Sequence, residues 1–161
     1  MKLQYFFMLI AFVINGRPAF AGAEKFDTQM QKVAEPYLKI QELLASDSTK
    51  GVAEFAKNIV EASKTLDTKM VTGEHAGHFA SLPSNLNKAA EELSKAKGLE
   101  SARSHFKQIS QAMATWAGMS KPKGINVMYC PMAKASWLQK GTEVHNPYYG
   151  QKMLSCGEMV K

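Results

Sequence analysis

The sequence predicts a mainly α-helical protein, an all-α up-down four-helix bundle with a short C-terminal tail that is irregular or contains β-structure. Three observations support this prediction. Apolar residues recur at spacings of three and four in four separate segments, which is the period of an amphipathic helix. Short connections, mostly marked by glycine, proline or serine, separate these segments, as expected between antiparallel neighbours in a bundle. The helical period is lost after Gly124.

The first 21 residues have the pattern of a cleavable secretory leader. Lys2 gives a positive start, residues 3–14 are almost entirely apolar, and Ala19 and Ala21 are small residues at the positions that a signal peptidase reads. The apolar run is too short to cross a bilayer of about 30 Å as a helix. We therefore expect a signal peptide at residues 1–21, no membrane span after cleavage, and a periplasmic or secreted protein.

Two apolar stripes predict the first half of the bundle. Phe26 to Leu44 forms the first stripe, and Pro36 inside it is expected to kink the helix or to start it afresh. Residues 46–48, Ser-Asp-Ser, end that helix and offer an N-cap for the next. The second stripe runs from Val52 to Leu66. These residues predict two helices joined by a short turn.

The second half of the bundle follows a loop. Pro83 belongs in the first turn of a third helix, whose apolar face runs from Leu82 to Leu93. From Leu99 to Trp116 the apolar residues step alternately by three and four, a near-heptad seam typical of helical bundles. We therefore assign residues 22–124 to the four-helix domain.

The charge distribution argues against a nucleic-acid partner. The formal charge is +6, and cleavage of the leader would remove two of these positive charges. Basic and acidic residues balance between positions 22 and 120, so the remaining excess lies in the tail. Beyond the leader the chain has one arginine, Arg103, and arginine dominates specific contacts to bases.

Residues 125–161 form a C-terminal segment rich in cysteine and methionine, which we expect to be packed on the bundle. Alternation from Ile125 to Tyr129 predicts a short strand, and residues 146–150, Asn-Pro-Tyr-Tyr-Gly, predict a turn. Trp137 and the tyrosines of that turn are the expected contacts with the helices. The segment contains both cysteines of the chain, Cys130 and Cys156.

The residues alone leave two interpretations of this segment open. In an oxidising compartment the two cysteines of a small domain usually pair, and a Cys130–Cys156 disulfide would stabilise the fold without any ligand. Alternatively, thiolate and thioether groups prefer Cu(I) and similar soft ions, so the same cysteines could bind a metal. Further donors within reach along the chain are Met132, Met153 and His145.

Three motifs in this segment resemble a known bacterial family. They are residues 128–133, Met-Tyr-Cys-Pro-Met-Ala; residues 146–150; and residues 153–157, Met-Leu-Ser-Cys-Gly. Together they resemble a secreted domain family of unknown function, found alone and at the C-terminus of periplasmic adaptor subunits of copper/silver efflux pumps. The resemblance implies copper handling, with Cys130, Met132 and Cys156 at the matched positions.

The tail is also similar, more loosely, to the short heavy-metal-binding module of the same transporters. That module has a histidine where this chain has Ala133, and a second cysteine where this chain has only Cys156 before its glycine. Because two of the metal-binding side chains of the module are missing, its complete metal site cannot be assigned to this chain.

The sequence thus predicts a secreted protein that binds a soft metal ion, Cu(I) in the first place, in efflux, buffering or sensing, with a heavy-metal efflux complex as partner. The alternative is a disulfide-stapled helical module for protein interaction at the cell envelope. We expect no enzyme, since no Ser/His/Asp or Cys/His arrangement has supporting spacing. A c-type haem is excluded because no Cys-x-x-Cys-His motif is present.

Overall fold

The computed structural model describes residues 18–73 and 76–160, in which helices dominate and a small antiparallel sheet follows them. This confirms the predicted mainly helical chain with β-structure near its C-terminus, while the up-down geometry of the helices stays a prediction. The leader predicted at residues 1–21 falls largely outside the described residues. The helices are α1 (Pro18–Ala45), α2 (Val52–Lys64), α3 (Ala76–Phe79), α4 (Leu82–Ser94) and α5 (Gly98–Ser120), with a 3-10 turn η1 (Thr68–Met70); then come β1 (Ile125–Cys130), β2 (Ala135–Lys140), the 3-10 turn η2 (Gly150–Met153) and β3 (Glu158–Met159).

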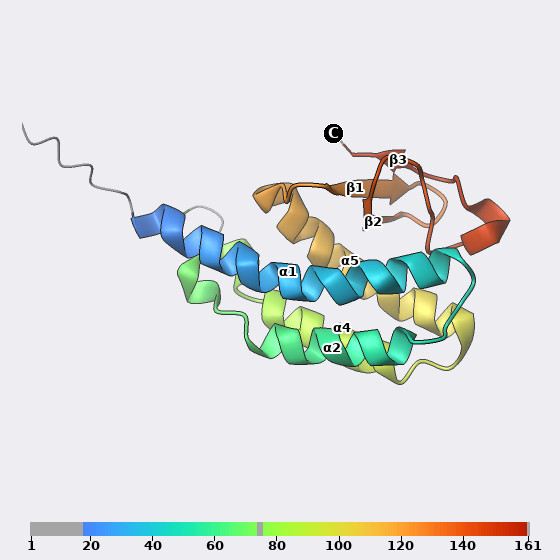
Figure 1. Cartoon of the computed structure of the whole chain (residues 1–161), viewed down its shortest axis with the longest axis horizontal. Coiled ribbons are helices and arrows are strands. Elements are labelled where there is room, and N and C mark those ends of the chain that lie inside the picture. The colour runs from blue at the N-terminus through green and yellow to red at the C-terminus, as the bar shows by residue number, and fades with distance from the viewer. Residues whose placement is uncertain (1–17, 74–75, 161) are drawn as a thin grey trace, which may run out of the picture.

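The elements are arranged in three layers (Figure 1). The long helices α1 and α5 lie in the middle, α2 and α4 cover one side of them, and the sheet covers the other side. Helix α2 contacts α1 and α4, α4 contacts α5, and β2 contacts both α5 and α1. Across the described residues, no helix combines the length and the apolar character needed to cross a membrane.

Helices α2, α4 and α5 begin and end close to the positions that the sequence predicts, whereas α1 begins earlier, at Pro18, and the short helix α3 lies where the sequence predicts a loop. Pro83 lies in the first turn of α4, where its missing N–H costs nothing. Helix α1 continues through Pro36, although the proline cannot donate to the carbonyl of Lys32. The apolar seam of α5 is buried as expected, including Phe106 and Trp116, which are both fully inaccessible to solvent.

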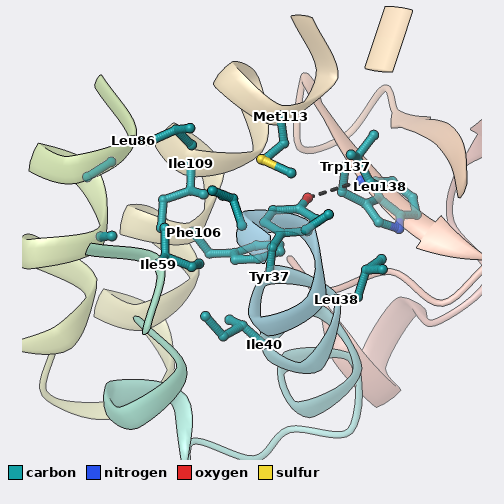
Figure 2. Close-up of a cluster of buried hydrophobic side chains, with 14 of the residues drawn as sticks. Tyr37, Leu38, Ile40, Ile59, Leu86, Phe106, Ile109, Met113, Trp137 and Leu138 are labelled. Carbon is teal, nitrogen blue, oxygen red and sulfur yellow. Dashed lines mark hydrogen bonds between the residues drawn. The ribbon is translucent and has the colours of Figure 1, made fainter. Parts of the chain in front are cut away.

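The core joins the helices to the sheet through Tyr37 (Figure 2). Its ring stacks on that of Phe106, with ring centroids 4.9 Å apart. Its hydroxyl is 2.8 Å from the Ser110 Oγ and accepts a hydrogen bond from the backbone N–H of Leu138 at 3.0 Å. A single buried hydroxyl therefore bridges α1, α5 and β2.

Strand β1 is the centre of the sheet, with β2 and β3 antiparallel on either side. Met128 lies opposite Trp137 of β2 and opposite Met159 of β3. Because side chains alternate along a strand, Met128 and Cys130 share one face with Trp137. The other face is directed toward α5 and carries Val127 and Tyr129.

Candidate functional site: a pair of thiols

The two cysteines lie side by side without a bond between them. Cys130 ends β1 and is completely buried, whereas Cys156 is half-buried and precedes β3. Their Sγ atoms are 3.1 Å apart. Strand β3 pairs with β1 in the antiparallel direction, and this pairing brings together two cysteines that are 26 positions apart in the sequence.

The turn after Cys130 supplies hydrogen-bond donors to its sulfur. The backbone N–H of Ala133 donates to the Cys130 Sγ at 3.4 Å. The turn closes through a hydrogen bond from Lys134 N–H to the Pro131 carbonyl, and Lys134 adopts the left-handed conformation that such a turn requires. From α5, Lys107 donates to the Ala133 carbonyl at 2.6 Å, so the helix holds this turn in place.

The environment makes the two thiols unequal. Burial alone would raise the pKa of the Cys130 thiol, but hydrogen bonds from Ala133 N–H, from Cys156, from Asn146 and from Met132 N–H together lower that pKa below its ordinary value. The hydrogen bond that Cys156 gives to Cys130, followed by burial, raises the pKa of Cys156. These opposite shifts fit a hydrogen bond in which the Cys156 S–H donates to the Cys130 sulfur.

Asn146 organises the loop on the other side of the pair. Its side chain is fully buried, donates to the Cys156 carbonyl at 2.6 Å, and accepts from the Tyr148 N–H at 2.8 Å. The sequence analysis assigned Asn146 only to a turn. An asparagine before proline is a turn signal, and no pattern in the sequence shows that this amide reaches the cysteines.

A second anchor ties the same loop to the helices. Arg103 of α5 donates to the carbonyls of Leu44 and Pro147, each at 2.8 Å, and pairs with the Asp47 carboxylate at 2.5 Å. Gly150 packs so tightly here that an added Cβ would fall within 2.1 Å of the Arg103 guanidinium. The structure thus gives the lone arginine beyond the leader a positioning role.

A close approach between Gly157 and Trp137 holds the arm that carries Cys156, which comprises residues 154–160. A Cβ built on Gly157 would lie 2.6 Å from the Trp137 ring and 3.1 Å from the Tyr129 carbonyl. Trp137 is itself buried against Tyr148, with ring centroids 5.9 Å apart. Only a residue without a side chain allows the arm to approach β1 so closely.

The other residues predicted as ligands lie around the pair to different degrees. Met132 follows in the turn after Cys130, and 63% of its surface is exposed. Met153 is half-buried, and its carbonyl accepts from the Cys156 N–H at 3.0 Å. The His145 ring is directed to solvent, with its Nε2 3.9 Å from the Glu143 carboxylate, so its described partner is not a sulfur. Among the described residues, no three histidine, cysteine, aspartate or glutamate side chains form a cluster suited to a metal ion.

These features define a helical domain whose C-terminal sheet presents two adjacent, unlinked thiols. Residues 33–123 match an uncharacterised domain family, described as "Protein of unknown function (DUF3347)". The match covers more than half of the chain, so the protein belongs to this family. It extends from the middle of α1 to the loop before β1, and therefore ends before both cysteines. Searches of curated proteins and of solved structures found no match.

Proposed function

We propose that the protein binds a soft metal ion, Cu(I) in the first place, through the sulfurs of Cys130 and Cys156. The observation that carries this proposal is the 3.1 Å approach of two thiols that are not joined. Thiolates are the ligands that Cu(I) prefers, and a metal site requires them deprotonated. The lowered pKa of the Cys130 thiol favours that state.

The separation of the sulfurs lies between that of a disulfide and that of two sulfurs on one ion. Two sulfurs at about 2.3 Å from one ion, at the tetrahedral angle of a zinc site, lie about 3.8 Å apart, and two thiolates that hold Cu(I) in a linear arrangement lie further apart. A disulfide needs about 2.05 Å. From 3.1 Å the sulfurs must separate by at least about 0.7 Å to hold an ion, and must approach by about 1.0 Å to bond, so a small movement of the arm reaches either state.

The best candidate for a third ligand is Met132. Its backbone N–H already lies at the Cys130 sulfur, and its exposed thioether is free of the core. Met153 is a weaker candidate because it is half-buried in η2. His145 is the weakest, since its side chain is half exposed and the charged group near its ring is Glu143.

Such a site fits a carrier, buffer or sensor rather than an enzyme. The resemblance of the tail to domains of copper/silver efflux adaptors supports a role beside an efflux complex, and the leader pattern supports a location in the periplasm or outside the cell. In this proposal the helices, arranged as an up-down four-helix bundle, are the scaffold, and the sheet presents the ligands.

Cu(I) titration of the reduced protein, in competition with a chromophoric chelator and without oxygen, tests the proposal. We expect one ion per chain, and a loss of affinity of at least 100-fold in each of Cys130→Ser and Cys156→Ser. Met132→Leu should weaken binding about tenfold, whereas Met119→Leu, at a half-buried methionine near the C-terminus of α5 and away from the thiols, is the control and should not. Equal affinity of the wild-type protein and both serine variants would rule out the site.

A structural disulfide is the second candidate, because the same 3.1 Å approach brings the sulfurs within a small movement of bonding. Such a bond would close a loop of about 27 residues and stabilise the fold by about 3–4 kcal/mol in the chain-entropy model. Titration of thiols in the protein isolated from an oxidising compartment separates the candidates. Two free thiols support the metal site, whereas none, with a lower melting temperature on reduction, supports the disulfide.

A further inference from the structure

A groove on the opposite face of β1 is separate from the thiol pair. It has a volume of about 910 Å³ and lies between the C-terminal half of α5 and the face of the sheet that carries Val127 and Tyr129. Its far edge is Val160, which follows β3 and is half exposed. The groove is partly open to solvent, so the facing surfaces of the sheet and of α5 are not completely covered by each other.

The floor of the groove consists of small and apolar residues. On α5 the lining residues Ala114 and Gly118 are four positions apart and therefore lie on one helical face. No atom lies within 4 Å of a Cβ built on Gly118, so this part of the groove is open space. Ile125 and Val127 of β1 form the opposite wall.

Lysines rim the groove, and none of its lining residues is acidic. Lys107 of α5 and Lys121, the residue that caps the C-terminus of α5, lie at opposite ends of the groove, and Lys134 lies in the turn that Lys107 contacts. Lys107 and Lys121 are 14 positions apart in the sequence, a distance of about 21 Å along the helix axis. An extended polypeptide covers that length with about six residues.

We infer that this groove binds an extended acidic segment of a partner protein, with apolar side chains between its carboxylates. Three lysines of the lining provide the charge complementarity, although Glu158 of β3 lies next to the lining, opposite Tyr129, and the small residues of the floor leave room for the apolar centre of the segment. The inference goes beyond metal binding and does not depend on it.

The length and chemistry of the groove separate this partner from other anions. The groove is as long as about six extended residues, and this elongated form suits a peptide segment better than a compact small ligand. A nucleic-acid strand would be expected to use arginine and several stacking aromatic rings, and the lining has no arginine and one aromatic residue, Tyr129.

Two variants probe the groove without disturbing the fold. Gly118→Leu fills the open space, and the helix tolerates it because Gly118 is exposed and leucine has a higher helix propensity than glycine. Lys121→Asn combined with Lys134→Asn removes two charges at positions of positive φ, which asparagine accommodates. Lys57→Gln combined with Lys88→Gln, on the exposed sides of α2 and α4, is the matched control.

The test uses the full chain, reduced and free of metal, so that its outcome is independent of copper binding. A library of random dodecapeptides displayed on phage is selected on the wild-type protein, and the enriched peptides are measured by fluorescence anisotropy. We expect peptides with carboxylates on both sides of an apolar centre. Their affinity should fall at least tenfold for Gly118→Leu and at least fivefold for the asparagine pair, and should stay unchanged for the control.

Three results would overturn the inference. One is the absence of any enriched peptide, and another is enrichment of basic or uncharged peptides. The third is undiminished binding to Gly118→Leu. A parallel titration with dodecanoate identifies a small anionic amphiphile: dodecanoate binding that Gly118→Leu abolishes, with no acidic peptide enriched, would also contradict a protein partner.

Discussion

Removing the Tyr37 hydroxyl should loosen the sheet from the helices. Tyr37→Phe keeps the ring that stacks on Phe106 and deletes only the oxygen that contacts Ser110 and the Leu138 N–H. All these groups are buried, so the Leu138 N–H would lose its partner without gaining water. A buried donor left unsatisfied costs about 1–3 kcal/mol, and we expect a loss of about 2 kcal/mol.

The size of this effect can be measured in two ways. With an entropy of unfolding of about 0.3 kcal/mol per kelvin for a domain of about 140 residues, the melting temperature should fall by about 7 °C. Amide hydrogen exchange at Leu138 should also become faster. Ser110→Ala is the control, because Tyr37 keeps its bond from Leu138, and it should cost only about 1 kcal/mol. A change below about 0.5 kcal/mol in Tyr37→Phe, within the range of a neutral surface substitution, would refute the bridging role.

Three further predictions concern other positions. The hydrogen bond from Arg103 lowers the pKa of Asp47 below 3.8. The ionised Asp47 carboxylate therefore stabilises the fold fully above pH 3.8, and this stabilisation is lost as the pH falls through the lowered pKa. In urea unfolding, the difference in stability between wild type and Asp47→Asn should shrink below pH 3.8. Gly157→Ala should push the Cys156 arm away from the Trp137 ring, costing about 1–3 kcal/mol and speeding alkylation of Cys130, and unchanged alkylation would contradict the packing described. Gly118→Ala should instead raise stability by about 1 kcal/mol in thermal unfolding, since α5 gains helix propensity in open space.

The helices could be predicted from the sequence because each buries one face only. In α5, for example, the spacing of Phe106, Ile109 and Met113 is enough to predict the helix and its buried face, and all three side chains are fully buried. Strand β2 could not be predicted in the same way. Trp137, Leu138 and Gln139 are consecutive and all buried, because this strand is covered on both faces and no alternation remains.

The site could be predicted only in its residue types. Cys130 and Cys156 were identified as candidates by their chemistry, and whether they meet depends on the pairing of β3, a strand of two residues that carries no pattern of its own. Gln139 is a comparable case. A buried glutamine looks unfavourable in sequence, yet its amide is satisfied by Trp137 Nε1, by His145 N–H and by the Glu143 carbonyl.

The shortness of β3 has a consequence for access to the buried sulfur. The arm that carries Cys156 is held by two residue pairs between β1 and β3, by the hydrogen bond from Val160 N–H to the Val127 carbonyl, and by Asn146. The helices, in contrast, share the large hydrophobic core. Segments with few contacts open at a lower free energy than the whole domain. The arm can therefore detach from β1 while the helices stay folded. Cys130 is buried in the closed form, and it becomes accessible to solvent through this local opening, without global unfolding.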